Sequence, residues 1–417
     1  MSAFSILAAA AAVQAAAQTG VPATSTQSDT SGSKRIAGQS TYLEVEGGIG
    51  YSTNPLLELG SDTGRGFGRI SLHAVHSRVS ERSTTVLSAY AQNVSYFGRY
   101  GSQQSASLTA RHDTALNEHV RLFVDAAASF DKGGQLDTRI IGLPEVPPLP
   151  GSSGLPPVLL PPNGDFLSIT GRTYRVAAHA GGSFALSPRD DLTISGGAEH
   201  VAFRGFEHTD YTTIPVSLAY DRVLSARTTV GARVVYEDTD YSGPAHVRVI
   251  TPQLTARMLL SPRLTVDGAI GASFASVDTG ISTTHSTGLS AQGNLCWQGE
   301  HDSLCARAST SEQTATVAGP ARSVSAGVDY SRTLDAVSSI SFSVGVDRYS
   351  APISVIAART FSSSTYYRAA ADYSRQIGHR LYGGVNIAAR KVTEAGPDPK
   401  ADLNASLFVR YRFGDVQ

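Results

Sequence analysis

The cysteine pair is the part of the sequence whose residue types and spacing most directly predict a chemical bond. The chain has two cysteines, Cys296 and Cys305, on either side of a short polar turn centred on Glu300 and His301. If the flanking segments are antiparallel strands, the cysteines face each other at a non-hydrogen-bonded position, where Cα atoms lie about 4.5 Å apart. We therefore predict a cross-strand disulfide, formed in an oxidising compartment. The alternative is a pair of small apolar residues at a membrane edge.

The other residues that could perform catalysis or bind metal do not form a recognised motif. The 11 histidines are scattered along the chain, and none lies in an H-E-x-x-H pattern. Serine is abundant, but no G-x-S-x-G nucleophile elbow occurs. Two cysteines are too few for a thiolate metal cluster. We therefore expect no enzymatic activity, no cofactor and no metal centre.

Charged side chains recur at alternate positions within segments whose other positions are apolar. Successive side chains of a strand point to opposite faces, so these charges share one face of a sheet. That face would be solvated in a soluble sandwich, but an apolar face on nearly every strand needs lipid or a second sheet, which favours the lumen of a barrel. The predicted lumen residues are Glu44, Glu46, Arg69, Arg121, Asp125, Arg175, Glu199, Arg233, Glu237, Arg257, Asp267, Asp329, Asp347, Arg368, Asp372, Arg390, Arg410 and Arg412. Because both signs of charge are present, we expect a hydrated interior without strong ion selectivity.

The elements that position these charges are predicted strands throughout residues 42–413. Val120, Leu122 and Val124, for example, alternate with Arg121 and Asp125. Short turns, such as residues 187–190, alternate with longer polar connections, such as 350–363. No window approaches the ~20 apolar residues of a membrane helix, and the mean hydropathy is −0.09. We predict an all-β fold, a transmembrane antiparallel up-and-down β-barrel of about 18 strands with short periplasmic turns and longer external loops.

The ends of the chain and one internal segment do not follow this alternation. Residues 1–17 are apolar and alanine-rich, which predicts a signal peptide, with an N-terminal helix as the alternative. Residues 18–40 are rich in Ser, Thr and Gly, which predicts a disordered periplasmic linker before the barrel of residues 41–417. Residues 133–164 contain eight prolines, which exclude a central strand or helix. We expect this segment to be an external loop that narrows or gates the pore.

Aromatic residues are expected on both faces of the strands. The tetrapeptide D-Y-S-R occurs twice, with Tyr330 and Tyr373, and Tyr220 lies in a related Y-D-R sequence. All three tyrosines are predicted on the apolar face, which indicates an interfacial aromatic girdle rather than a general strand preference. Five other aromatic residues are predicted to point inward: Tyr90, Tyr96, Phe123, Tyr382 and Phe408.

Both ends of the predicted barrel resemble known outer-membrane proteins. The strand of residues 403–413, L-N-A-S-L-F-V-R-Y-R-F, resembles the C-terminal signal strand of Gram-negative outer-membrane β-barrels, although four residues follow Phe413. The opening segment, with its G-Y-S-T-N element, resembles a large family of outer-membrane porins, some of which accompany exopolysaccharide export. The resemblance implies a location in the cell outer membrane, contact with its lipid, and an assembly signal at Tyr411 and Phe413 for the barrel-assembly machinery.

The functional expectation is a porin-like barrel with a hydrated pore for small hydrophilic solutes. Two alternatives stay open, namely an outer-membrane component of exopolysaccharide export, whose partners would be a polysaccharide or its export complex, and a plugged structural barrel. A net charge of −1 argues against a nucleic-acid partner, which would require a basic surface.

Overall fold

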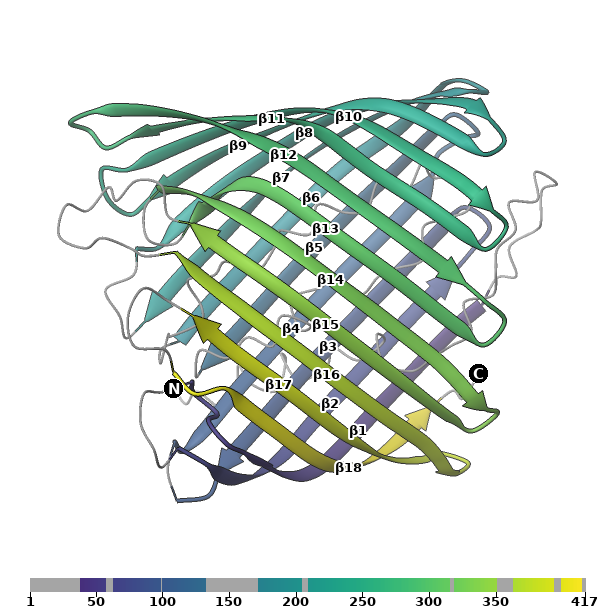
Figure 1. Ribbon diagram of the computed structural model, residues 1–417. Helices are drawn as coiled ribbons and strands as arrows, with labels where there is room; N and C mark the ends of the chain where they lie inside the picture. The colour runs from purple at the N-terminus through teal and green to yellow at the C-terminus, as the bar shows by residue number, and fades with distance from the viewer. Residues whose placement is uncertain are drawn as a thin grey trace, which may run out of the picture.

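Antiparallel strands run up and down in sequence order and close into a barrel in the computed structural model (Figure 1). The structure describes residues 38–57, 63–98, 100–132, 172–204, 209–315, 319–350, 363–393 and 399–414. The strands are β1 (Gly38–Ser52), β2 (Arg65–Val79), β3 (Ser83–Tyr96), β4 (Ser102–Ala115), β5 (Val120–Lys132), β6 (Arg172–Ser187), β7 (Asp190–Arg204), β8 (Tyr211–Ser225), β9 (Thr228–Tyr241), β10 (His246–Ser261), β11 (Leu264–Asp278), β12 (Thr283–Gln298), β13 (Asp302–Ala315), β14 (Gly319–Asp335), β15 (Ser338–Ser350), β16 (Ser364–Gly378), β17 (Leu381–Thr393) and β18 (Asp402–Gly414).

Closure is made by the first and last strands. Each strand pairs with its neighbours in sequence, and β1 also pairs with β18, with Leu43 opposite Phe413 and Ser52 opposite Asn404. A closed antiparallel sheet leaves no unpaired edge, which is the condition for crossing a membrane with strands. The predicted fold class, an 18-stranded up-and-down β-barrel, is confirmed.

Connections of different length lie at the two ends of the barrel. At one end the strands are joined by turns of two to four residues, and at the other the connections include residues 53–64, 133–171 and 351–363. The sequence analysis missed one connection, residues 97–101 between β3 and β4. Gly98, Tyr100 and Gly101 there have φ values of 84°, 72° and 60°. Two glycines suit this tight turn because they adopt positive φ without steric cost.

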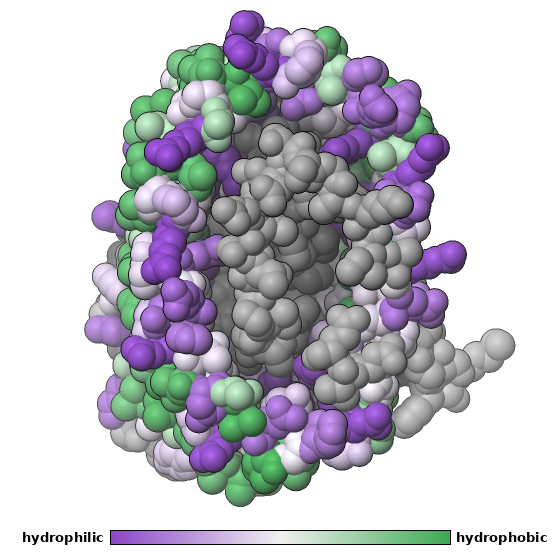
Figure 2. Space-filling view, turned by 90° about the vertical axis from the view of Figure 1, so that its right-hand side faces the viewer, coloured by the Kyte–Doolittle hydropathy of each residue, from purple (hydrophilic) through white to green (hydrophobic). Residues whose placement is uncertain are grey.

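The outer surface is apolar in the middle of the strands, and the inner surface is polar. Leu254, Ile270, Val344 and Ile387 are exposed on the outside of their strands. Residues on the inward positions, such as Glu44 and Arg410, are buried or half-buried. This is the alternation expected of a barrel that faces hydrocarbon outside and water inside. Figure 2, which faces the end with the short turns, shows many hydrophilic residues around the rim.

Among the described residues, no helix is long and apolar enough to cross a membrane. β1 begins at Gly38, so the predicted linker is three residues too long. Residues 38–40 extend the strand because their backbones pair with Ser77, Arg78 and Val79 of β2, and this pairing does not need apolar side chains. The predicted signal peptide, the rest of the linker and the proline-rich segment 133–164 lie outside the described residues.

The tyrosine motif forms a repeated contact at the short-turn end. The Tyr220 hydroxyl donates to Asp190 Oδ1 at 2.6 Å, and Arg222 Nη1 lies 3.5 Å from the same oxygen. The same arrangement recurs with Tyr330, Arg332 and Asp302, at 2.7 Å and 3.6 Å. Tyrosine and arginine two positions apart share a face, so both reach the aspartate that begins the preceding strand. An amphipathic tyrosine held in this way suits the boundary between lipid and water.

Candidate functional site

The candidate site is the inner wall of the barrel, where the predicted charged residues meet. The strand registers place all eighteen of them on the side opposite the exposed apolar residues. They come from thirteen strands, so the site is a lining rather than a single constellation. Such a lining can hold water and polar solutes, because nearly every strand contributes a charged or hydrogen-bonding group.

The densest group of ion pairs lies at the seam between β1 and β18. Arg412 Nη2 lies 2.5 Å from Glu44 Oε1, and Arg410 Nη2 lies 2.8 Å from Glu46 Oε2. Glu46 also accepts from Arg69 Nη2 of β2 at 2.7 Å. Glu44 and Arg412 are direct cross-strand partners, as are Glu46 and Arg410. Opposite charges in register stabilise strand pairing, so these groups favour the pairing of β1 with β18.

Most other predicted acidic residues also have a partner on a neighbouring strand. The pairs are Arg175–Glu199 at 2.7 Å, Arg368–Asp347 at 3.0 Å, Asn294–Asp267 at 2.8 Å and His179–Asp125 at 3.1 Å, with Arg307–Asp329 and Asn386–Asp372 also in hydrogen-bonding contact. Arg390 pairs with Asp402 at 2.5 Å, and Ser52 Oγ donates to the same carboxylate at 2.6 Å. Most of these carboxylates are therefore neutralised by a cation or, for Asp267 and Asp372, hydrogen-bonded to an amide, which reduces the cost of holding them inside the barrel.

Three residues of the predicted set differ from this pattern. The buried Arg233 donates through Nε to the neutral Gln253 Oε1 at 3.0 Å, and Gln253 Nε2 donates to Ser290 Oγ at 2.8 Å. Arg257 is exposed and Glu237 is half-buried, and neither forms an ion pair within the described residues. Of the three, Arg257 is the side chain best able to interact with a passing solute, because it is exposed.

Several charged residues of the inner wall are absent from the predicted lumen set. These are His73, Arg111, Asp113, Asp131, Asp191, Asp221, Arg307 and Asp402. His73 Nδ1 lies 3.2 Å from Glu44 Oε2, and Arg111 Nε lies 2.8 Å from Asp113 Oδ2. Applying the same alternation to every charged residue of each strand would have found them, because a strand keeps the face periodicity along its whole length.

A buried apolar cluster covers part of the inner wall at the end with the longer connections. It consists of Val201, Phe203, Tyr211, Tyr241, Ala245, Val247, Val249, Ala275 and Val277, from β7 to β11 and the β9–β10 connection. The strand residues among them occupy inward positions, where the alternation predicts polar groups. This sector of the wall is therefore packed rather than hydrated. The sequence analysis did not identify the cluster.

The five aromatic residues predicted to point inward occupy inner-wall positions on different strands. Phe408 and Tyr96 are buried, and Phe408 fills the space beside Gly384, where a Cβ atom would lie 2.4 Å from Phe408 Cζ. Arg412 Cζ lies 5.7 Å from the centre of the Tyr382 ring. The five residues do not form one continuous stripe, because they lie on β3, β5, β17 and β18.

Cys296 and Cys305 are cross-strand partners on β12 and β13 and are joined by a disulfide, with Cα atoms 4.1 Å apart. Their neighbours in register are Thr265 and Asp329, so the bond lies on the inner wall.

Without reductant, we expect alkylation to add no mass to the denatured protein, because register holds the two thiols together during folding. After reduction, two alkyl groups should be added. Two modified thiols in the unreduced protein would exclude the bond.

Tyr411 and Phe413 lie on the outer face of β18 at the short-turn end. Both are partly exposed, and their ring centroids are 4.6 Å apart.

We predict that Phe413→Ser reduces membrane insertion in cells several-fold, because it removes the last apolar side chain of this strand. Deletion of residues 415–417 is the control and should have a smaller effect. If the deletion is the more harmful change, the signal is not at Phe413.

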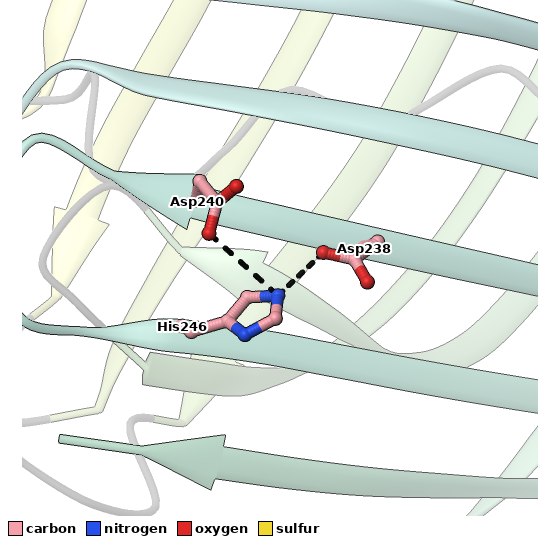
Figure 3. A group of neighbouring side chains, drawn as sticks. All are labelled: Asp238, Asp240 and His246. Atoms are coloured by element: carbon pink, nitrogen blue, oxygen red, sulfur yellow. Dashed lines mark hydrogen bonds and ion pairs between the residues drawn. The ribbon is translucent and has the colours of Figure 1, made fainter. Parts of the chain in front are cut away.

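One group of possible metal ligands lies on the outer face of β9 and β10 (Figure 3). His246 Nε2 lies 2.5 Å from Asp238 Oδ1 and 3.7 Å from Asp240 Oδ1. The second oxygen of Asp238 accepts from the Tyr236 hydroxyl at 2.8 Å and lies 3.4 Å from Arg248 Nε. Because an arginine already neutralises Asp238, we interpret the group as a polar network of the barrel surface. The sequence analysis did not anticipate it.

No protein-family model and no curated protein matches this sequence. Among solved structures, the chain is similar to the FrpB iron transporter of Neisseria meningitidis (F5-1 variant, apoprotein), with 8% identity, 90% of this chain and 81% of that chain covered, and a TM-score of 0.47. For the F3-3 variant the values are 11%, 86%, 62% and 0.45. For OccK2 of Pseudomonas aeruginosa they are 8%, 91%, 98% and 0.46.

Proposed function

We propose that this barrel is a porin-like channel of the bacterial outer membrane that conducts small hydrophilic solutes. The observation that carries the proposal is the closed 18-stranded barrel with a charged inner wall and an apolar outer belt. Charged groups inside a dry barrel would each cost several kcal/mol unless every one were paired. Arg257 is exposed on the inner face of β10 and has no ion-pair partner among the described residues. Water is the solvent that stabilises such groups, so a hydrated path follows.

The wall determines what kind of solute passes. Most of its charges are paired across neighbouring strands, so the net field in the lumen is weak and the expected selectivity is low. Arg257 has no ion-pair partner among the described residues, and it is exposed on the inner face of β10. We propose that it favours the passage of anions close to its side chain.

The test is ion conductance in planar bilayers with the purified, refolded protein. We expect discrete openings, and we expect Arg257→Glu to shift the reversal potential in a salt gradient toward cation selectivity. Arg227→Glu is the matched control, because Arg227 is exposed in the β8–β9 turn, beyond the ends of the strands. It should leave the reversal potential nearly unchanged. An equal shift for both variants would remove Arg257 from the conducting path.

A second candidate function is a barrel without an open path, serving a structural role. The buried apolar cluster on the inner wall of β7–β11 favours it, because that sector excludes water. Absence of conductance from correctly folded protein, with heat-modifiable migration in gels, would select this alternative. No described contact favours a role in exopolysaccharide export.

The proposed location carries further assignments. The short-turn end, which holds the end of β18, faces the periplasm, and the end with the longer connections faces the exterior. The partners are membrane lipid and the barrel-assembly machinery. We propose no enzymatic role, since the wall charges are committed mainly to ion pairs between strands.

A further inference from the structure

Three cations stand in direct cross-strand register on the outer face of neighbouring strands. Lys132 ends β5 and is opposite Arg172, which begins β6, and Arg172 is opposite Arg204, which ends β7. The outward direction follows from alternation, because Val124, Val176 and other residues of the same parity are exposed outside. All three lie at the end with the longer connections. We call Lys132, Arg172 and Arg204 the cation row.

The cation row is only partly neutralised within the described residues. Arg204 Nη1 lies 2.9 Å from Asp210 Oδ2, whereas Lys132 and Arg172 make no ion pair there. Burial raises the pKa of the Asp210 carboxyl. Hydrogen bonds from the Phe203 N–H and from Arg204 lower this pKa by more than burial raises it, so the pKa lies below its usual range. Asp210 therefore stays ionised and supplies one negative charge. Like charges directly opposite each other destabilise strand pairing, so the row favours an additional anion.

Aromatic residues lie directly next to the row on the side of the apolar belt. Phe130 and Tyr174 are cross-strand partners, each two residues from the row toward the middle of its strand, β5 or β6. Their ring centroids are 5.2 Å apart. Tyr174 is exposed on the outer face. Aromatic residues mark the depth at which acyl chains meet headgroups. The cations beyond them are therefore at headgroup depth.

We propose that the cation row binds the phosphate groups of a phosphorylated glycolipid in the outer leaflet. Neighbouring strands are about 4.8 Å apart, so the row extends over ~10 Å, enough for two phosphates. Arginine guanidinium groups bind phosphate oxygens through two parallel hydrogen bonds, and lysine adds a point charge. The acyl chains would lie along Phe130, Tyr174 and the apolar belt. The inference rests on the proposed membrane location, and it does not depend on whether the lumen conducts.

The test is native mass spectrometry of the detergent-solubilised full chain, titrated with lipid A, which carries two phosphates. Dephosphorylated lipid with the same acyl chains is the matched probe. We expect the wild type to prefer the phosphorylated lipid, and the triple variant Lys132→Gln, Arg172→Gln, Arg204→Gln to bind it on the order of a hundredfold more weakly, at roughly a factor of five per cation.

The control variant is Arg189→Gln, Arg227→Gln, Arg380→Gln, which removes the same charge from exposed turns at the opposite end. It should keep the wild-type preference. Equal binding of lipid A by wild type and cation-row variant would overturn the proposal, as would equal loss in both variants. Conductance is measured on the same samples. Because the row lies outside the lumen, loss of lipid A binding and loss of conductance are independent outcomes, and each tests its own proposal.

Discussion

Replacing Leu254 with arginine should destabilise the folded barrel by about 2–4 kcal/mol, which is the cost of arginine at the lipid-facing midplane of a membrane barrel. Leu254 lies in the middle of β10 on the outer face, and it is 67% exposed. A residue so exposed on a soluble protein would tolerate arginine with little change. The measurement is the urea dependence of folding into lipid vesicles, followed by tryptophan fluorescence or by heat-modifiable gel migration.

Ile281→Arg is the matched control for this substitution. Ile281 is 97% exposed in the β11–β12 connection, outside the strands and outside the apolar belt. The two variants introduce the same side chain at two exposed apolar positions, so only the surrounding medium differs. We expect the free energy of unfolding of Ile281→Arg to stay within about 0.5 kcal/mol of wild type. Equal effects of the two substitutions would contradict a lipid-facing belt.

Glu44→Ala should lower the free energy of unfolding by about 3–5 kcal/mol, since it removes one member of a buried ion-pair group. Glu44 is only 2% exposed and lies between Arg412 and His73. Its loss leaves Arg412 at the seam without the carboxylate that faces it. Because β1 and β18 close the barrel, we also expect slower folding into vesicles. Urea titration and folding kinetics measure the two effects.

Two further variants make the seam prediction specific. Glu300→Ala removes an exposed carboxylate that pairs with Arg263 at 3.1 Å, and it should change stability by less than about 1 kcal/mol. The double variant Glu44→Ala, Arg412→Ala should be less destabilised than the sum of its single variants, because both remove the same interaction. Additive effects would show that Glu44 and Arg412 do not act as a pair.

The seam, the cation row and the inner apolar cluster give the barrel an uneven character around its circumference. The seam holds buried ion pairs on the inside, and β5–β7 hold cations on the outside. The inner face of β7–β11 is packed with apolar groups at the same end as the cation row. We propose that a solute path runs along the remaining, polar sectors of the wall, where Arg257 is exposed on the part of β10 toward the short turns.

The sequence by itself determined the properties that depend on neighbouring residues. Alternation along each segment predicted the strands, their approximate number and the inward direction of residues such as Arg233 and Asp267, because face periodicity is local. The spacing across a short turn likewise placed Cys296 opposite Cys305, since a hairpin turn sets its own register. Composition likewise predicted the alternation of short and long connections, except for residues 97–101 between β3 and β4.

Only the tertiary structure decided the properties that depend on register between distant segments. Glu44 meets Arg412 across a sequence separation of 368 residues, and no local pattern specifies which charge on β18 faces which on β1. Lys132, Arg172 and Arg204 likewise form a row only after β5, β6 and β7 are paired. The apolar cluster inside the wall was missed because valine and tyrosine at inward positions break the alternation that predicted the rest. The physical reason is that closure brings together side chains whose separation in the chain carries no information about their contact.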